Sequence, residues 1–312
     1  MSDYLHWTAG LALVLGCSGP SQSALPPVPP PTLEEHVRFM TEQEPTRDWE
    51  HPDVLDAVAE YIGGQFEAAG GRVETQDYAV RGETYRNVRA FFGPAEGKRL
   101  VIGAHYDVAG HLPGADDNAS GVAALMDLAH RIGDVELTTQ IELVAFSLEE
   151  PPFFREPEMG SAVHARSLVD EGVEVLGMIN FEMVGYFTDE PDSQEYPLDA
   201  MKALYPNAGN FITVVGRPQD EELLEAVQSA MGEATELPVV PFIAPASIIG
   251  VDLSDHLNYW DQGFSALMIT DTSFYRNSNY HTENDTADTL DYRRMELVVE
   301  GAFAAVMWLA AG

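Results

Sequence analysis

Three short apolar runs, each followed by an ionisable residue, constrain the fold of this chain more than any other feature of its sequence. The runs are RLVIGA at 99–104 before His105, TQIELVAFSL at 139–148 before Glu149 and Glu150, and VLGMINF at 175–181 before Glu182. Nearly continuous apolar segments of this length are typical of strands buried on both faces of a parallel sheet. We therefore expect a sheet whose central strands end at ionisable side chains.

Amphipathic segments, with apolar residues three and four positions apart, alternate with strand-like segments along the chain. We expect helices at 33–40, 52–69, 119–132, 160–169, 220–231 and 292–310. We expect strands at 72–80, 85–92, 99–104, 139–148, 175–183, 211–216, 239–243 and 264–270. This alternation predicts an α/β fold, a three-layer sandwich in which helices flank a central mixed, mostly parallel sheet. Ligands of such sheets bind beyond the carboxyl ends of the strands, where the ionisable residues are expected.

The first 31 residues predict export. Residues 5–16 are apolar but too short to span a membrane, and they lead into Cys17 in a pattern that resembles the bacterial lipobox. Residues 18–31 are rich in Ser and Pro and indicate an extended tether. We expect a signal peptide at 1–17, a tether at 18–31 and a folded domain at 32–312. The protein would then be a periplasmic or outer-membrane lipoprotein, or secreted, and would contact the membrane only through its lipid anchor.

One feature at the N-terminus disagrees with export. The segment before the apolar run carries Asp3 and no Lys or Arg, whereas export signals normally begin with basic residues. A frayed apolar terminus with a chance cysteine is therefore the alternative. Cys17 is the single cysteine of the chain, so an intramolecular disulfide and a thiolate metal site are both excluded.

The net charge excludes a nucleic-acid partner. The chain has 16 Lys and Arg against 51 Asp and Glu, a formal charge of −35. Nucleic acid and anionic lipid are bound mainly by basic patches, which such a surface does not favour. The acidity has two open interpretations, solubility of an exported protein and electrostatic steering of substrate.

Imidazole and carboxylate groups form a candidate metal constellation. His105 is followed two residues later by Asp107, which could orient its ring. Asp116 and Asp117 precede small residues at the start of a helix, where capping is the alternative role. Adjacent carboxylates at the end of a buried strand, such as Glu149 and Glu150, are costly without a compensating positive charge. Glu182 and His281 complete the set. His111, before the GADD turn, is expected to be a solvated loop residue.

Five sequence blocks, in the order GAHYD, GADDNASG, SLEE, INFEM and YHTENDT, resemble metallopeptidase family 28, over roughly residues 32–312. The resemblance implies the zinc exopeptidase fold and two Zn²⁺ ions per chain. It implies one zinc site at His105 and Glu182, a second at Glu150 and His281, and a bridging Asp117. It also implies Glu149 as general base, Asp107 as the partner of His105, and Asp255 and His256 as supporting or helix-capping residues. Many family members have Asp where this chain has Glu182, so the longer side chain departs from the common pattern.

The implied activity is hydrolysis of the N-terminal peptide bond by a water activated by two metals, with Glu149 accepting its proton. Tyr280 either assists as an oxyanion donor or only packs beside His281. Peptides are the expected substrates, and loops at 189–210 and 242–252 are the expected pocket walls. The alternatives are a carboxypeptidase, a glutaminyl cyclase and a non-catalytic peptide-binding lipoprotein. The oligomeric state is not indicated by the sequence.

Overall fold

The structure is a computed structural model that describes Met1 and residues 30–311. The folded body is the unit that begins at Pro31. The predicted signal peptide, Cys17 and most of the predicted tether lie outside the described residues. Among the described helices, none combines the length and the apolar character that crossing a bilayer requires.

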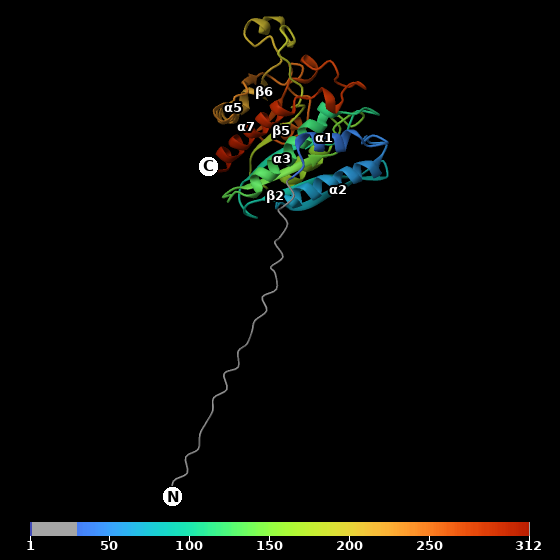
Figure 1. The fold of residues 1–312 in the computed structure, drawn as a ribbon, viewed down its shortest axis with the longest axis vertical. Helices are drawn as coiled ribbons and strands as arrows, with labels where there is room; N and C mark the ends of the chain where they lie inside the picture. The colour runs from blue at the N-terminus through green and yellow to red at the C-terminus, as the bar shows by residue number, and fades with distance from the viewer. Residues whose placement is uncertain (2–29, 312) are drawn as a thin grey trace. The chain divides into compact units, whose positions relative to one another are not determined.

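A mixed sheet of eight strands forms the centre of the described body (Figure 1). The strands are β1 (Arg72–Val80), β2 (Glu83–Phe92), β3 (Arg99–His105), β4 (Gln140–Phe146), β5 (Val175–Phe181), β6 (Ile212–Gly216), β7 (Val239–Ile243) and β8 (Ala266–Thr270). Their order across the sheet is β1-β2-β4-β3-β5-β8-β6-β7. The four central strands, β4, β3, β5 and β8, are parallel to one another. Their carboxyl ends therefore share one edge of the sheet.

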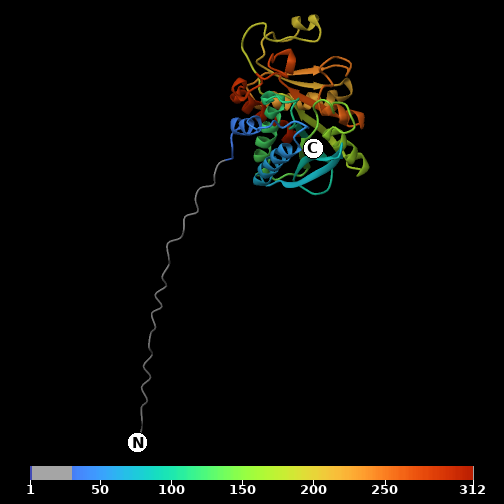
Figure 2. The same cartoon turned by 90° about the vertical axis from the view of Figure 1, so that its right-hand side faces the viewer.

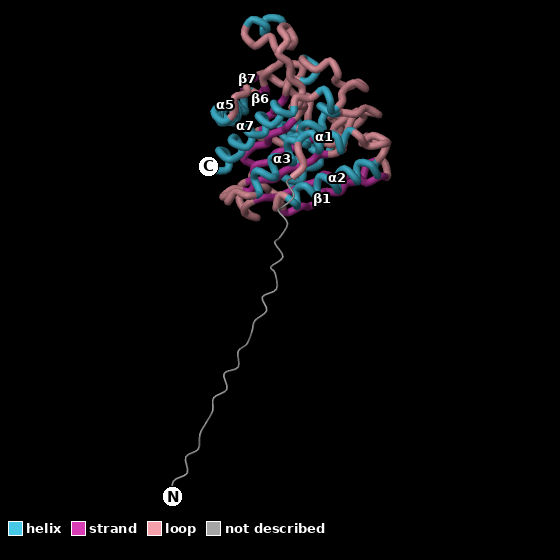
Figure 3. The backbone as a smooth tube through the Cα atoms, viewed as in Figure 1, coloured by secondary structure: helices cyan, strands magenta, loops and turns pink. Residues whose placement is uncertain are grey.

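Helices cover both faces of the sheet and confirm the predicted three-layer α/β class. The helices are α1 (Leu33–Thr41), α2 (Pro52–Ala68), α3 (Gly121–Gly133), α4 (Gly160–Asp170), α5 (Glu221–Ala234), α6 (His256–Asp261) and α7 (Tyr292–Ala311). The larger apolar core lies between the sheet and α1, α2, α3, α5 and α7. A smaller core lies on the opposite face, under α4 and α6. Figure 3 shows the strands behind the helices of the larger core.

Local sequence explains several element boundaries. Thr32 and Glu35 form a capping box that begins α1, because each side chain binds a backbone N–H of the other residue. The turn between β1 and β2 has positive φ angles at Arg81 and Gly82, as a two-residue hairpin requires. The β-hairpin thus begins and ends close to where the sequence predicts it.

Three local features differ from what the sequence predicts. The helix predicted from residue 119 begins instead at Gly121, because residues 115–120 form an irregular turn with non-helical angles at Asp117 and Asn118. The short helix α6 was not predicted. The segment 189–210, predicted as irregular, contains the 3₁₀ helix Asp199–Ala203. Figures 1 and 2 both show this segment, in yellow, projecting from the body.

Candidate active site

The five predicted ligands come together at the carboxyl edge of the sheet, although each belongs to a separate segment. His105 ends β3, Asp117 lies in the irregular turn before α3, Glu150 follows β4, Glu182 follows β5, and His281 lies between β8 and α7. The parallel arrangement of β3, β4 and β5 explains the convergence, since residues at their carboxyl ends are neighbours in space.

The ligands form two groups that share Asp117. In the first group, His105 Nε2 lies 3.4 Å from Asp117 Oδ1 and 3.3 Å from Glu182 Oε2. In the second, His281 Nε2 lies 3.0 Å from Asp117 Oδ2 and 3.3 Å from Glu150 Oε2. The two oxygens of Asp117 thus face different groups. This is the arrangement that a bridging carboxylate requires.

Buried polar atoms without partners show that these residues fit metal ions. Both ring nitrogens of His105 and the Oε1 atom of Glu150 are buried and have no hydrogen-bond partner among the described residues. Buried polar atoms are normally paired, so such atoms in a cluster of imidazoles and carboxylates indicate missing ligation. Imidazole nitrogen and carboxylate oxygen are the donors that zinc accepts.

The site carries more negative charge than its own side chains neutralise. Asp117, Glu149, Glu150 and Glu182 are buried, and in the described part of the chain none of them forms an ion pair with a Lys or Arg within 4.0 Å. Burial, with the neighbouring Asp117 charge, raises the pKa of Glu150 to about 8 despite the opposing effect of His281. Burial also raises the pKa of Glu149 well above its usual value. A divalent cation would reverse both shifts.

Asp107 holds the two adjacent glutamates and faces His105. Its carboxylate accepts the backbone N–H groups of Glu149 and Glu150, at 3.1 Å each. Its Oδ1 atom lies 3.5 Å from His105 Nδ1, on the side of the ring away from the ligand group. This is the position in which a carboxylate orients a metal-binding imidazole. Glu149 Oε2 lies 3.9 Å from His105 Nε2, so its carboxylate is close to the first group.

The comparisons with known proteins identify the family. The model of peptidase family M28 matches residues 87–306, a span that contains all five ligands. The chain belongs to peptidase family M28. Protein YfbL of Escherichia coli K12 is 47% identical over 294 residues, which cover 90% of each chain. Leucine aminopeptidase 1 of Ajellomyces dermatitidis is 24% identical over 212 residues, 64% of this chain and 49% of that protein. The chain therefore spans about half the length of this fungal relative.

Solved structures share the fold. LapB from Legionella pneumophila matches with a TM-score of 0.70 and 22% identity, over 91% of this chain and 73% of its own. A glutaminyl cyclase from Bacteroides thetaiotaomicron matches with a TM-score of 0.64 and 20% identity, over 88% and 96%. BSAP, a zinc aminopeptidase from Bacillus subtilis, matches with a TM-score of 0.57 and 19% identity, over 73% and 51%. Together with the family match, the aminopeptidase relatives support a hydrolase of the peptidase class.

Several residues that hold this M28 site were missed in the sequence. The Asp285 carboxylate accepts the backbone N–H groups of Asp116 and Asp117, at 2.9 and 3.1 Å, and so fixes the bridging residue. The Ser254 hydroxyl donates to Glu182 Oε2 at 2.6 Å. Arg47 is fully buried and donates to the carbonyls of the loop before Asp117. Asp285 belongs to the YHTENDT block, which could have indicated it. No local pattern indicates Arg47.

The remaining predicted residues lie near the predicted ligands in different roles. The Tyr280 ring stacks on the His281 ring, with centroids 3.9 Å apart. Asp255 occupies the N-cap position of α6, but its side chain makes no capping bond, so the capping interpretation is wrong for this residue. His256 Nε2 lies 2.8 Å from the Val251 carbonyl oxygen, in the buried region under α6. His111 is an exposed loop residue, as predicted, although its ring also contacts Asp48.

A pocket lined mainly by apolar side chains opens beside the first ligand group. Glu182 and Tyr280 lie on its wall, and the walls include the apolar residues Phe211, Val215, Phe242, Leu253, Met268 and Phe274. Residues of the projecting segment, including Tyr196 and Met201, form another part of the wall. Both loops predicted as pocket walls therefore contribute. No Lys or Arg belongs to the described lining.

Proposed function

We propose that the chain is a zinc-dependent aminopeptidase that hydrolyses the N-terminal peptide bond of peptides with an apolar first residue. The observation that supports this proposal best is the combination of two ligand groups sharing Asp117 with an apolar cavity beside Glu182. The ligand groups supply the chemistry, and the cavity supplies a place for the side chain of the first residue.

The residues would hold two zinc ions in the arrangement implied by the ligand geometry. His105 and Glu182 would hold one ion, Glu150 and His281 the other, and Asp117 would bind both. Zinc, when bound, lowers the pKa of a water molecule and polarises a carbonyl oxygen. The donor set supports zinc over magnesium or calcium, because those ions prefer oxygen ligands alone.

Glu149 is the proposed general base. Its carboxylate accepts a proton from the attacking water and returns that proton to the leaving amine. Asp107 fixes the Glu149 backbone through the hydrogen bond to its N–H group. The carboxylate is therefore held at the edge of the ligand cluster without acting as one of the five proposed ligands.

Tyr280 is the proposed donor to the carbonyl oxygen of the scissile bond. Burial and the nearby carboxylates, beginning with Asp117, raise the pKa of Tyr280, so its hydroxyl stays protonated. A protonated hydroxyl beside the reacting carbonyl can donate a hydrogen bond as negative charge develops there. The stacking on His281 holds the ring in place.

The charges around the cavity support an aminopeptidase over a carboxypeptidase. A carboxypeptidase needs a cationic group for the substrate carboxylate, and the described cavity lining has no Lys or Arg. A free substrate amine, in contrast, carries a positive charge that the acidic site attracts. Arg155 forms an ion pair with Asp252 of the loop 242–252, with 2.8 Å between Nη2 of the arginine and Oδ2 of the aspartate.

Cyclisation of N-terminal glutamine is the second candidate activity, because a glutaminyl cyclase shares the fold. The presence of both complete ligand groups supports hydrolysis instead. It also argues against a binding protein that has lost catalysis, since no predicted ligand is missing from the cluster.

The test is release of the first residue from a peptide panel. The folded unit from Pro31 onward would be assayed with peptides that begin with Leu, Phe, Asp, Lys or Gln, each with a free and an acetylated amine. We expect zinc-dependent release that acetylation blocks. Leu and Phe should give kcat/KM about tenfold or more above Asp and Lys, because burying one apolar side chain contributes about 1.5–3 kcal/mol. Cleavage of acetylated peptides, or cyclisation of the Gln peptide without cleavage, would contradict the proposal.

Export and lipidation are proposed from the sequence alone. The apolar run before Cys17 and the Ser- and Pro-rich segment after it support an envelope lipoprotein. We expect a fatty-acid analogue to label the wild-type protein in a bacterial host and the label to be lost in Cys17→Ala. Equal labelling of both proteins would contradict it.

A further inference from the structure

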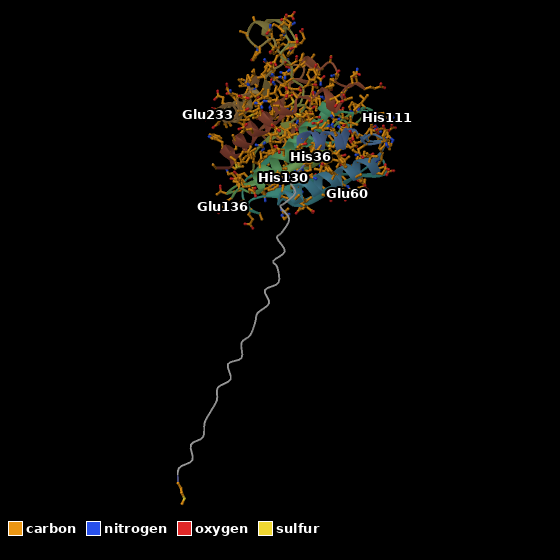
Figure 4. The ribbon with its side chains drawn as sticks, viewed as in Figure 1. His36, Glu60, His111, His130, Glu136 and Glu233 are labelled. Carbon is orange, nitrogen blue, oxygen red and sulfur yellow. The ribbon has the colours of Figure 1, made fainter. Side chains whose placement is uncertain are left out.

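A second group of metal-ligand side chains lies outside the active site. It consists of Asp48 and His51, between α1 and α2, and His111, in the loop that follows β3. One ligand atom from each residue lies within 4.8 Å of the others. His111 is labelled in Figure 4 at the outer edge of the body. The group therefore joins two segments that are far apart in the sequence.

The distances in this group resemble those in the active site. Asp48 Oδ2 lies 2.9 Å from His51 Nδ1 and 3.1 Å from His111 Nδ1. In the active site, the distances between imidazole nitrogens and carboxylate oxygens of each ligand group are 3.0 to 3.4 Å. Ligands at about 2.0–2.2 Å from a tetrahedral zinc ion are separated by roughly 3.3 Å.

The donors around Asp48 are shared unevenly between its two carboxylate oxygens. Asp48 Oδ2 also lies 2.7 Å from the Thr46 hydroxyl, so three donors face this one oxygen. Each carboxylate oxygen offers about two lone-pair directions, so the three donors crowd around Oδ2. The Oδ1 atom accepts one backbone N–H, that of Glu50. A cation between the imidazoles and Oδ2 would replace two N–H donors by one positive charge.

The surroundings of the group suit a cation. The side chain of Asp48 is 1% exposed, and that of His111 is 67% exposed, so the group has a buried anchor and access from solvent. Glu50 Oε2 lies 3.8 Å from His111 Nε2, on the other side of the ring, and adds negative charge beside the imidazole.

We propose that Asp48, His51 and His111 bind a third divalent transition-metal ion of the zinc, nickel or copper type. Two imidazoles and a carboxylate are donors for these ions rather than for calcium or magnesium, and water fills the remaining positions. The ion ties the segment before α2 to the loop 106–114. Arg47 holds the same loop through the carbonyls of Pro113 and Gly114, and the loop leads directly to Asp117.

The first test counts metal ions in the tag-free protein. Wild-type protein would be stripped of metal, dialysed against Zn²⁺ and analysed by mass spectrometry of the metal. We expect three zinc ions per chain in the wild type and two in His111→Ala. His130→Ala, which removes a half-buried histidine outside the group, is the matched control and should keep three. Equal counts in wild type and His111→Ala would overturn the proposal.

The second test separates this site from the active site. One equivalent of Cu²⁺ would be added to wild type and to His111→Ala, each loaded beforehand with only two equivalents of Zn²⁺, and the electron paramagnetic resonance spectrum recorded. Wild type should show one copper with nitrogen hyperfine structure from two imidazoles, and the variant should lose this signal. A two-nitrogen signal that persists in His111→Ala would place the copper elsewhere and overturn the proposal. This readout needs no peptidase activity, so failure of the proposed function leaves its outcome unchanged.

Discussion

Two buried clusters of charge in this body differ in the source of their neutralising cations. In the sheet, Glu142 of β4 lies 2.6 Å from Arg89 Nε, 2.8 Å from Arg99 Nη1 and 3.0 Å from His164 Nε2. Burial raises its pKa, but these three groups lower it to about 2. In the active site burial acts in the same direction, no arginine forms an ion pair with the glutamates, and the pKa of Glu150 rises to about 8.

This difference shows which buried carboxylates need a bound cation to neutralise their charge. A buried acidic residue that forms ion pairs with arginines has its charge neutralised by the protein itself. A group of buried acidic residues facing only two imidazoles is incomplete until a cation arrives. The partners of each carboxylate, rather than its burial, therefore separate the structural cluster from the candidate site.

The largest effect should come from removing the proposed base. Glu149→Gln keeps the size of the side chain but removes its proton affinity, so kcat should fall by about 10²- to 10⁴-fold with the zinc content unchanged. Peptide hydrolysis and metal analysis check this result. Glu158→Gln, at an exposed position nearby, is the matched control. Loss of zinc from Glu149→Gln would show that Glu149 is a ligand instead.

Removing the metal should destabilise the active-site cluster but not the Glu142 cluster. Metal in 1,000-fold excess over its dissociation constant stabilises a folded protein by about 4 kcal/mol. We therefore expect chelation to lower the melting temperature by about 10 °C, at about 2–4 °C per kcal/mol for a body of this size. Circular dichroism during heating measures the shift, and added Zn²⁺ should reverse it. An unchanged melting temperature would argue against buried ligation.

Breaking the other cluster should affect stability alone. Glu142→Gln leaves Arg89 and Arg99 buried without their carboxylate, which costs about 3–5 kcal/mol. Urea unfolding measures the loss, with the exposed Glu225→Gln as control. The zinc content and kcat of the surviving folded protein should stay at wild-type values. A selective loss of zinc would show that the two clusters are coupled.

The pH dependence of stability should have opposite signs in the two clusters. Glu142 has a lowered pKa in the folded state, so its contribution is present above its usual value and is lost as pH falls towards about 2. In the metal-free protein Glu150 has a raised pKa, so the folded state loses stability as pH rises from 4.5 to about 8. The gap in melting temperature between zinc-loaded and metal-free protein should therefore widen from pH 5 to pH 8. A constant gap would contradict this sign.

The smallest effect is expected from the hydroxyl that orients Glu182. Ser254→Ala removes the bond to Glu182 Oε2, and the Asn180 amide then loses the acceptor to which it donates at 2.7 Å. Loss of a residue that orients a ligand typically lowers metal affinity by about 10- to 100-fold. Competition with a zinc-binding dye should show this for one of the two ions expected at the active site. Ser254→Thr, which keeps a hydroxyl, should retain most of the affinity, and equal weakening in both variants would rule out the hydroxyl.

The sequence predicted the structural features that depend on residues close together in the chain. The apolar run 99–104 predicts a buried strand, and its position in a parallel sheet places His105 at the carboxyl edge. Glu142 shows the limit of this reasoning. Glu142 interrupts the apolar run 139–148. The sequence around it does not indicate that Arg89, Arg99 and His164 neutralise its charge.

Other features escaped prediction because distant segments create them. The irregular turn at Asp117 depends on the Asp285 carboxylate, far away in the sequence. Arg47 is buried because the carbonyls of another loop accept its hydrogen bonds. The helix α6 has six residues, too few for a helical periodicity to be visible.

The bonds from Asp285 to the Asp116 and Asp117 amides also make the second ligand group depend on the segment between β8 and α7. His281 and Asp285 both lie in this segment, which is synthesised after the other four predicted ligands. A growing chain that has not reached this segment therefore has an incomplete second ligand group and an unfixed Asp117 carboxylate. On the proposed function, such a chain cannot yet hydrolyse peptides.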